Sequence, residues 1–381
     1  MPRVLFRMTN SCRPAHAIIT DLPNLVAALP PAKRARFERI FRVDVAVGEI
    51  RIPDSMRAWT EAQLGPIEGV ERQSVVRVTN TVTWDGALFN PLRGKRPMRH
   101  ATTSNVKRKE PSDDIFAEPL RTTAEDMFGR VRGKHCVTAG NISRWEGQSA
   151  VLIFDEYDPL KFNREQLRDY IATTWEWAQR AHAHDPEARY FVWGWNGGLK
   201  AGASIPHGHA QMALGRGMHY ARIEWLRRAA LDYRARYGTN YFADLQAAHD
   251  DVGLGITAGK LRGFIYLAPT CLKETWLMGR AFDDELADAL HDALRALIDR
   301  TGTDAFNVFV TLPPSPSPFE GEGRGEGVPT NNENWSGFPL LMRIGDRGPA
   351  SMVSSDIGWI DLYAHNVIST DPFVVKVLTE L

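Results

Sequence analysis

Two histidines and a glutamine stand at alternate positions of this chain, as His207, His209 and Gln211. In a β-strand, side chains two residues apart point to the same face, so a strand here would place all three on one surface. A glycine-rich stretch, residues 196–204, precedes them. Imidazole is a neutral nucleophile near pH 7, and glycines let backbone N–H groups approach an anion. The pattern therefore indicates chemistry on phosphorus.

The elements around this motif follow an order that occurs twice. In the first round we expect strands at 136–138, 150–154, 190–195 and 205–214, with a helix at 164–182. In the second round we expect strands at 263–268, 306–312, 338–344 and 357–363, an apolar stretch at 275–278 and a helix at 283–300. Helices at 219–237 and 241–249 connect the rounds. The shared order predicts an α+β fold built from two copies of one unit.

Three segments follow from this pattern. Residues 1–74 are polar and proline-rich, with one helix at 32–42, and are interpreted as an N-terminal extension. Residues 75–215, which open with strands at 75–83 and 88–89, form the first unit, and residues 216–381 form the second. The second unit contains a Ser-Pro and glycine-rich insertion near 313–335. It has neither the lysine nor the following helix of a phosphate loop, so we expect a disordered insertion.

Composition restricts the class of protein further. Lys plus Arg and Asp plus Glu both number 46, so no overall field favours nucleic acid or an anionic membrane. Cys12, Cys136 and Cys271 are far apart, which argues against a disulfide scaffold or a cysteine-rich zinc site. The first thirty residues do not form a signal-peptide core, and no apolar run approaches a membrane span. We expect a cytoplasmic protein.

The spacing Asn196-x5-Gly202-x-Ser204-x2-His207-x-His209-x-Gln211 resembles the histidine-triad superfamily. The likeness is to its branch of galactose-1-phosphate uridylyltransferase and related nucleotide phosphorylases. It implies two tandem units, each an antiparallel sheet with flanking helices, that form an intramolecular pseudo-dimer. It also implies that His209 is the nucleophile. Gln211 stands where hydrolytic members carry a third histidine, and an amide cannot ionise, which favours transfer over hydrolysis.

Weaker matches extend the resemblance to other substrate-binding residues. Arg93 and Arg96 lie in a segment similar to the family's arginine-containing segment that reaches substrate phosphates. Planar guanidinium groups suit that task, although a run that also holds Lys95 is equally typical of a solvated surface. Asn141 is placed where the family has a nucleotide-contacting asparagine, but it would also suit a turn.

The resemblance assigns His207 to a structural metal in the zinc-bearing members. In this sequence the C-x-x-C partner is missing, and His100 or His135 would supply only part of a ligand set. We therefore expect no required cofactor and no metal. His207 is interpreted as a residue that holds the strand and the His209 ring by hydrogen bonds. The second unit lacks His-x-His at 338–343, so it is expected to be a degenerate copy that completes the pocket.

The function that the resemblance implies is nucleotidyl transfer. His209 would take a nucleoside monophosphate from a nucleoside diphosphate sugar or a dinucleotide, and phosphate or a sugar phosphate would then accept it. The alternatives are a catalytically silent nucleotide-binding protein, a nucleotide hydrolase of the same fold, or a divalent-metal protein using His207 and His209. A homodimer is compatible with the resemblance, and neither nucleic acid nor a membrane is expected as a partner.

Overall fold

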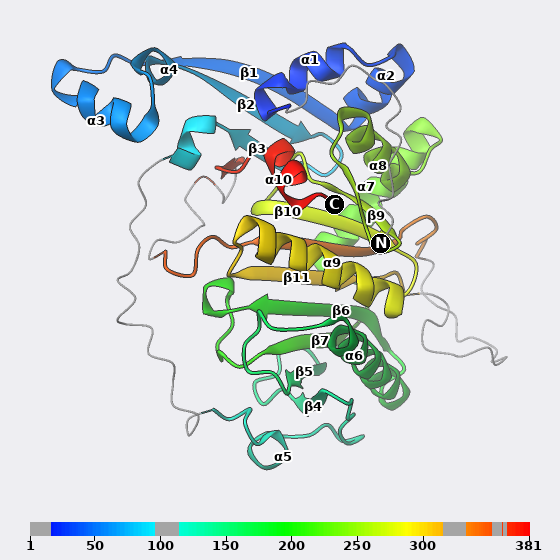
Figure 1. The fold of residues 1–381 in the computed structure, drawn as a ribbon. Helices are drawn as coiled ribbons and strands as arrows, with labels where there is room; N and C mark the ends of the chain where they lie inside the picture. The colour runs from blue at the N-terminus through cyan, green and yellow to red at the C-terminus, as the bar shows by residue number, and fades with distance from the viewer. Residues whose placement is uncertain (1–16, 96–113, 315–332, 353–359, 361–363) are drawn as a thin grey trace, which may run out of the picture.

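The computed structural model describes residues 17–95, 114–314, 333–352, 360 and 364–381. Two sheets organise these residues, one of nine strands and one of four (Figure 1). All the pairings of the larger sheet are antiparallel. The structure is therefore α+β, as the sequence predicts.

The first repeat supplies four strands and one long helix. These are β4 (Cys136–Gly140), β5 (Gln148–Phe154), α6 (Arg164–His184), β6 (Ala188–Gly197) and β7 (His209–Arg216). The helix begins where the sequence predicts because the side chain of Asn163 accepts the backbone N–H of Gln166 at 2.9 Å. Leu167, Ile171 and Ala178 recur at helical spacing and are fully buried, which fixes the face that packs on the sheet.

The second repeat supplies the same elements in the same order. These are β9 (Leu261–Ile265), β10 (Leu272–Gly279), α9 (Asp284–Thr301), β11 (Phe306–Thr311) and β12 (Leu340–Asp346), with β8 (Gly255–Ala258) added at the edge. The strand order is β4-β5-β7-β6-β11-β12-β10-β9-β8, so the order of one half reverses that of the other. The predicted pair of tandem units forming an intramolecular pseudo-dimer is confirmed.

The two halves join at the centre of the larger sheet. Strand β6 pairs with β11 in antiparallel register, from Gly197 opposite Phe306 to Val192 opposite Thr311. Helices α6 and α9 lie on the same face, where Arg168 forms an ion pair with Asp288 at 2.8 Å (Figure 1). One face of the sheet is therefore buried under helices, and the other carries the motif residues.

A smaller sheet adjoins the second unit (Figure 1). Its strands, in spatial order, are β1 (Phe41–Glu49), β2 (Arg72–Asn80), β3 (Gly86–Phe89) and β13 (Asn366–Ile368). Strand β2 begins before the expected boundary at residue 74, and residues 75–89 belong to this sheet rather than to the β4–β7 sheet. Strand β13 pairs parallel to β3, so both ends of the described chain contribute to it.

The remaining helices cover the sheets and connect the units. They are α1 (Leu22–Ala27), α2 (Pro31–Ile40), α3 (Asp54–Leu64), α4 (Ile67–Glu71), α5 (Pro119–Thr122), α7 (Ala221–Tyr237), α8 (Tyr241–Val252) and α10 (Pro372–Thr379). Short 3-10 turns are η1 (Ile19–Asp21), η2 (Pro91–Lys95) and η5 (Leu199–Ala201). Most of the strand expected at 357–363 and most of the insertion expected at 313–335 lie outside the described residues.

The strand that carries the motif starts later than the sequence predicts. It begins at His209 rather than Ile205. Pro206 has no N–H for a sheet, and the N–H of Gly208 bonds to the carbonyl of Tyr157 at 2.8 Å instead of continuing the ladder with β6. His207 therefore lies in the preceding turn. The expected common face holds for His209 and Gln211 and fails for His207.

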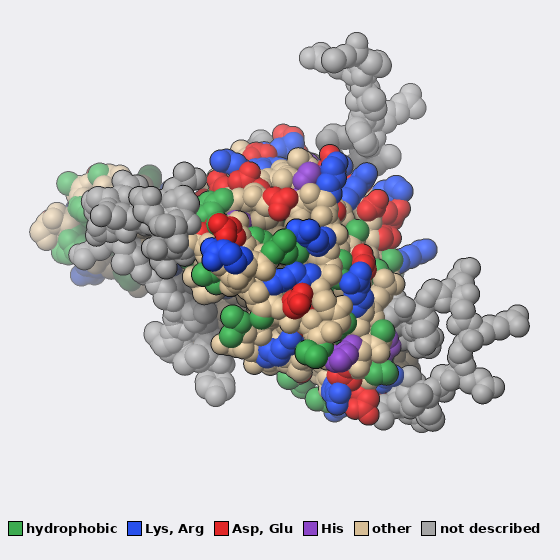
Figure 2. Space-filling model, turned by 90° about the horizontal axis from the view of Figure 1, so that it is seen from below, with side chains coloured by type: hydrophobic (Ala, Val, Ile, Leu, Met, Phe, Trp, Pro, Cys, Tyr) green, Lys and Arg blue, Asp and Glu red, His purple; other side chains and the backbone are tan. Residues whose placement is uncertain are grey.

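The surface agrees with the balanced composition. On the face seen in Figure 2, acidic and basic side chains are interspersed rather than gathered by sign. Within the described part of the chain, every helix is too short or too polar to span a membrane.

Candidate active site

The glycine-rich stretch forms a tight turn between β6 and β7. Gly198 and Gly202 both have φ of +95°, a backbone conformation that side chains with a Cβ rarely adopt. Between them, η5 is closed by hydrogen bonds of 3.0 Å from Ala201 N–H to the Gly198 carbonyl and from Gly202 N–H to the Leu199 carbonyl. The loop is therefore a defined structure that ends beside the first residue of β7.

His209 is held in one tautomer. Its Nδ1 lies 2.8 Å from the backbone carbonyl of His207, and a carbonyl can only accept, so Nδ1 carries the hydrogen. The lone pair is then on Nε2. Burial lowers the pKa of His209 below its ordinary value of 6.5, and only 4% of the residue is exposed. His209 is therefore a neutral imidazole with a nucleophilic Nε2 at neutral pH.

His207 is fixed through both ring nitrogens. Nδ1 lies 2.6 Å from a carboxylate oxygen of Asp114, and Nε2 lies 2.7 Å from the backbone carbonyl of Phe154. The ring of Tyr157 also contacts it, with centroids 5.3 Å apart. The backbone carbonyl of His207 therefore accepts the hydrogen bond from His209, while the His207 ring contacts Asp114 and Phe154.

Phe116 covers both histidines. Its ring meets His209 at a centroid distance of 5.2 Å and His207 at 6.0 Å, both edge to face. It also belongs to a small apolar cluster with Val137, Ala139 and Ile153. The segment that follows residue 113 thus forms one wall of the site.

Gln211 shares the face of His209 along β7. The register places His209 opposite Ile153, and Gln211 lies between Val151 and Gly194 of the neighbouring strands. Gln211 is half-buried. Because Gly194 has no side chain, the space beside the Gln211 amide on this face is not filled by β6.

The second unit contributes directly to the glycine loop. The Nδ2 group of Asn307 on β11 donates to the side-chain oxygen of Asn196 at 2.7 Å and to the carbonyl of Ala201 at 2.8 Å. Arg347, just past β12, donates to the Asn307 side-chain oxygen at 3.0 Å. The side chain of Asn196 also reaches the Gly202 carbonyl at 3.5 Å. The loop is therefore held by both halves of the pseudo-dimer.

The other residues predicted for the site lie at different distances from it. Ser204 is exposed at the end of the loop, close in sequence to His209. Asn141 follows β4 on the same sheet face, but register places it four residues along and two strands across from His209, roughly 16 Å away. Arg93 lies in η2, beside the smaller sheet, and Arg96 lies outside the described residues.

The donor set around His207 does not fit a zinc ion. Both ring nitrogens face acceptors already, so neither offers a lone pair to a metal. In the described part of the chain, no group of three or more histidine, cysteine, aspartate or glutamate residues could hold a metal ion. Burial also raises the pKa of the Cys136 thiol far above its ordinary value, which disfavours the thiolate that zinc binds.

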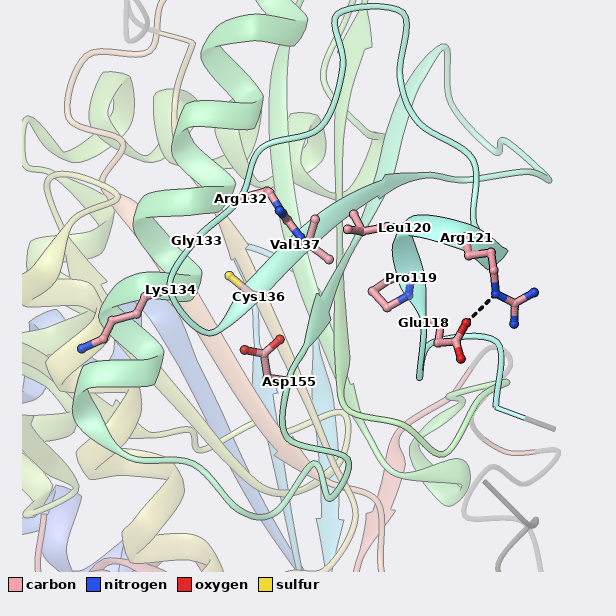
Figure 3. Close-up of a pocket in the computed structure, with 10 residues that line it drawn as sticks. All are labelled: Glu118, Pro119, Leu120, Arg121, Arg132, Gly133, Lys134, Cys136, Val137 and Asp155. Atoms are coloured by element: carbon pink, nitrogen blue, oxygen red, sulfur yellow. Dashed lines mark hydrogen bonds and ion pairs between the residues drawn. The ribbon is translucent and has the colours of Figure 1, made fainter. Parts of the chain in front are cut away.

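A hollow of about 750 Å³ opens beside β4, the outermost strand at this end of the larger sheet (Figure 3). It lies between α5 and the segment that holds Arg132 and Lys134, with Cys136 and Asp155 at its floor. Lys134 extends toward α6 and pairs with Glu165. Phe116 packs on the sheet between this edge and His209, so the hollow is separate from the site described above.

Asp114, Phe116 and Asn307 are the residues that sequence reasoning missed. Asn307 had one usable signal, because it is a polar residue inside the strand predicted at 306–312. Asp114 and Phe116 follow a charged stretch with no periodic pattern, and they meet the histidines 93 residues further along the chain. Only the folded structure brings them to the site.

The tandem antiparallel units, joined where β6 pairs with β11, form a fold that several solved structures share. Solved structures with this fold include an ADP-glucose phosphorylase of Arabidopsis thaliana with bound ADP-glucose, which is 17% identical with a TM-score of 0.57. The match covers 79% of this chain and 96% of that one.

Two further solved structures superpose on this chain about equally well. A GalT-like protein of Arabidopsis thaliana is 16% identical with a TM-score of 0.56, covering 80% of this chain and 97% of that one. A uridylyltransferase is 14% identical with a TM-score of 0.53, covering 80% and 97%. No family model and no curated protein sequence matches the chain. The resemblance seen in the sequence is confirmed at the level of the fold.

Proposed function

We propose that this protein is a nucleotidyltransferase or phosphorylase that acts through a covalent nucleotidyl-His209 intermediate. The donor would be a nucleoside diphosphate sugar or a dinucleotide, and the acceptor phosphate or a sugar phosphate. The observation that carries the proposal is the hydrogen bond from His209 Nδ1 to the His207 carbonyl, which leaves Nε2 as a buried, neutral nucleophile.

The chemistry balances without an added cofactor. Nε2 of His209 attacks the α-phosphorus of the donor, the P–N bond forms, and the bond to the bridging oxygen breaks, releasing a sugar phosphate or nucleotide. An oxygen of the acceptor phosphate then attacks the same phosphorus and releases His209. Because the transition state spreads negative charge over the phosphoryl oxygens, positioned donors matter most. The Gln211 amide and the Ser204 hydroxyl are the side chains proposed for this role.

Asn196 and Gly202 would shape the loop that accepts the phosphates. Arg93 and Arg96 remain proposals as phosphate-binding groups, as Asn141 does for the nucleotide. One of the solved structures with this fold contains bound ADP-glucose, which makes ADP-glucose with phosphate the first donor and acceptor to test.

The test measures how much labelled nucleotide stays covalently bound to the protein, with a second histidine variant as a matched control. The protein is incubated with ADP-glucose labelled at the α-phosphorus, and other nucleoside diphosphate sugars and dinucleotides follow as a panel. Wild type should retain acid-labile label, His209→Ala should retain none, and His291→Ala, a histidine on α9, should label like wild type. Equal labelling of wild type and His209→Ala would refute the proposal.

A nucleotide-binding protein without turnover is the second candidate. The burial of His209 beside Phe116 favours it, because only 4% of the residue is exposed in this structure. Nucleotide-dependent thermal stabilisation of the whole chain, without any exchange of labelled phosphate into nucleotide, would support this second reading. Measurable exchange would remove it.

A further inference from the structure

One carboxylate contacts both parts of the machinery around His209. Oδ2 of Asp114 lies 2.6 Å from Nδ1 of His207, and Oδ1 accepts the backbone N–H of Phe116 at 2.9 Å. The side chains of Asp114 and His207 are only 8% and 7% exposed. Asp114 thus fixes the ring of one histidine and also the residue that packs on the other.

The hydrogen-bond partners of the two His207 ring nitrogens bear on the charge of the Asp114–His207 pair. Its second nitrogen faces the Phe154 carbonyl at 2.7 Å, and a carbonyl cannot donate. An ionised Asp114 cannot donate either, and beside that carboxylate both ring nitrogens of His207 would carry hydrogen. The contacts are then those of an imidazolium facing a carboxylate. A buried charge is tolerated when it contacts a group of opposite charge.

We propose that Asp114 is a positioning residue for the nucleophile. It holds the His207 ring so that the His207 carbonyl faces Nδ1 of His209, and it anchors Phe116 against the His209 ring. The effect on rate rests on the proposed nucleotidyl transfer, whereas the ion pair stands on geometry alone.

Asp114 would act by keeping His209 in the tautomer that has its hydrogen on Nδ1, through the position of His207. If the His207 ring turned away, its carbonyl would shift from the 2.8 Å contact with His209 Nδ1. The hydrogen of His209 could then move to Nε2, which would no longer be a nucleophile. Outer partners that orient an imidazole in this way are commonly worth about 10- to 100-fold in activity. Among the described residues, the ionisable side chains in contact with His207 are Asp114 and Tyr157 at its ring and His209 at its backbone carbonyl, and Asp114 is the carboxylate of the three.

The test compares Asp114→Asn with Glu118→Gln, a carboxamide change at an exposed carboxylate of the same segment. Asp114→Asn should lower the single-turnover rate of nucleotidyl-enzyme formation by about 10- to 100-fold and leave the Kd of ADP-glucose within about twofold. Glu118→Gln should change neither. A wild-type rate in Asp114→Asn would overturn the proposal, as would an equal loss in both variants.

A second measurement is independent of activity. Nitrogen-15 NMR of wild type at pH 7 should show that both ring nitrogens of His207 carry hydrogen. A bare ring nitrogen on His207 would overturn the pair even if Asp114→Asn failed to fold. If wild type formed no nucleotidyl-enzyme but His207 carried both hydrogens, the proposed function would fail and the ion pair would stand.

Discussion

Replacing Asn307 with leucine tests whether the second unit holds the glycine-rich loop at residues 196–204. Leucine has a similar size but removes three hydrogen bonds, to Asn196, to the Ala201 carbonyl and from Arg347. At about 1 kcal/mol for each bond, the loss is about 3 kcal/mol. If the loop must hold its shape in the transition state, that energy corresponds to a fall of about 100-fold in kcat/KM.

Two assays distinguish a loop effect from a general loss of stability. Hydrogen exchange at the amides of Ala201, Gly202 and Ala203 should accelerate in Asn307→Leu, because these amides close the turn. The control is Asn240→Ala, which loses a helix cap at 3.0 Å and a bond to Gly337 at 2.7 Å in the same unit. It should lower Tm without changing loop exchange or kcat/KM. Unchanged loop exchange in Asn307→Leu would refute the reasoning.

Two further predictions concern stability and the loop backbone. Burial lowers the pKa of His249 from 6.5 to about 3, so only the unfolded state takes up a proton at this residue as pH falls from 7 to 5. The free energy of unfolding should therefore fall by about 2 kcal/mol over this range. Urea titrations of wild type and His249→Gln check this, and an equal change of unfolding free energy with pH in the two proteins would contradict it. Gly208→Ala should abolish loop order and lower Tm, because an added Cβ would lie 2.7 Å from the Glu156 carbonyl oxygen. A wild-type melting curve would contradict this expectation. The control is Gly217→Ala, at an exposed turn where φ is positive but the space is open, so it measures the cost of backbone strain alone.

Much of the fold follows from local patterns in the sequence. The strands and helices of both repeats were predictable because apolar periodicity and caps such as Asn163 act over a few residues. Strand β1 was not predictable in this way. Most of its side chains are exposed, and it is a strand because it pairs with β2, which lies beyond α3 and α4 in the sequence.

The candidate site was predictable only in its central motif. The spacing of Asn196, His207 and His209 is local and could be recognised from the sequence. The start of β7 could not, since it depends on Gly208 bonding to Tyr157 rather than to β6. Likewise Asn307 reaches Asn196 across 111 residues of sequence, and only strand pairing brings them together. Local patterns therefore indicate the chemistry, and long-range contacts determine how it is positioned.

The central claim is that His209 becomes covalently nucleotidylated. The most direct measurement is intact-protein mass spectrometry after rapid quenching in base of wild type mixed with ADP-glucose, followed by fragment mapping. The account predicts a mass increase of one nucleoside monophosphate, located on His209, lost in acid and discharged when phosphate is added. Turnover without an adduct, or an adduct on another residue that persists in His209→Ala, would contradict it.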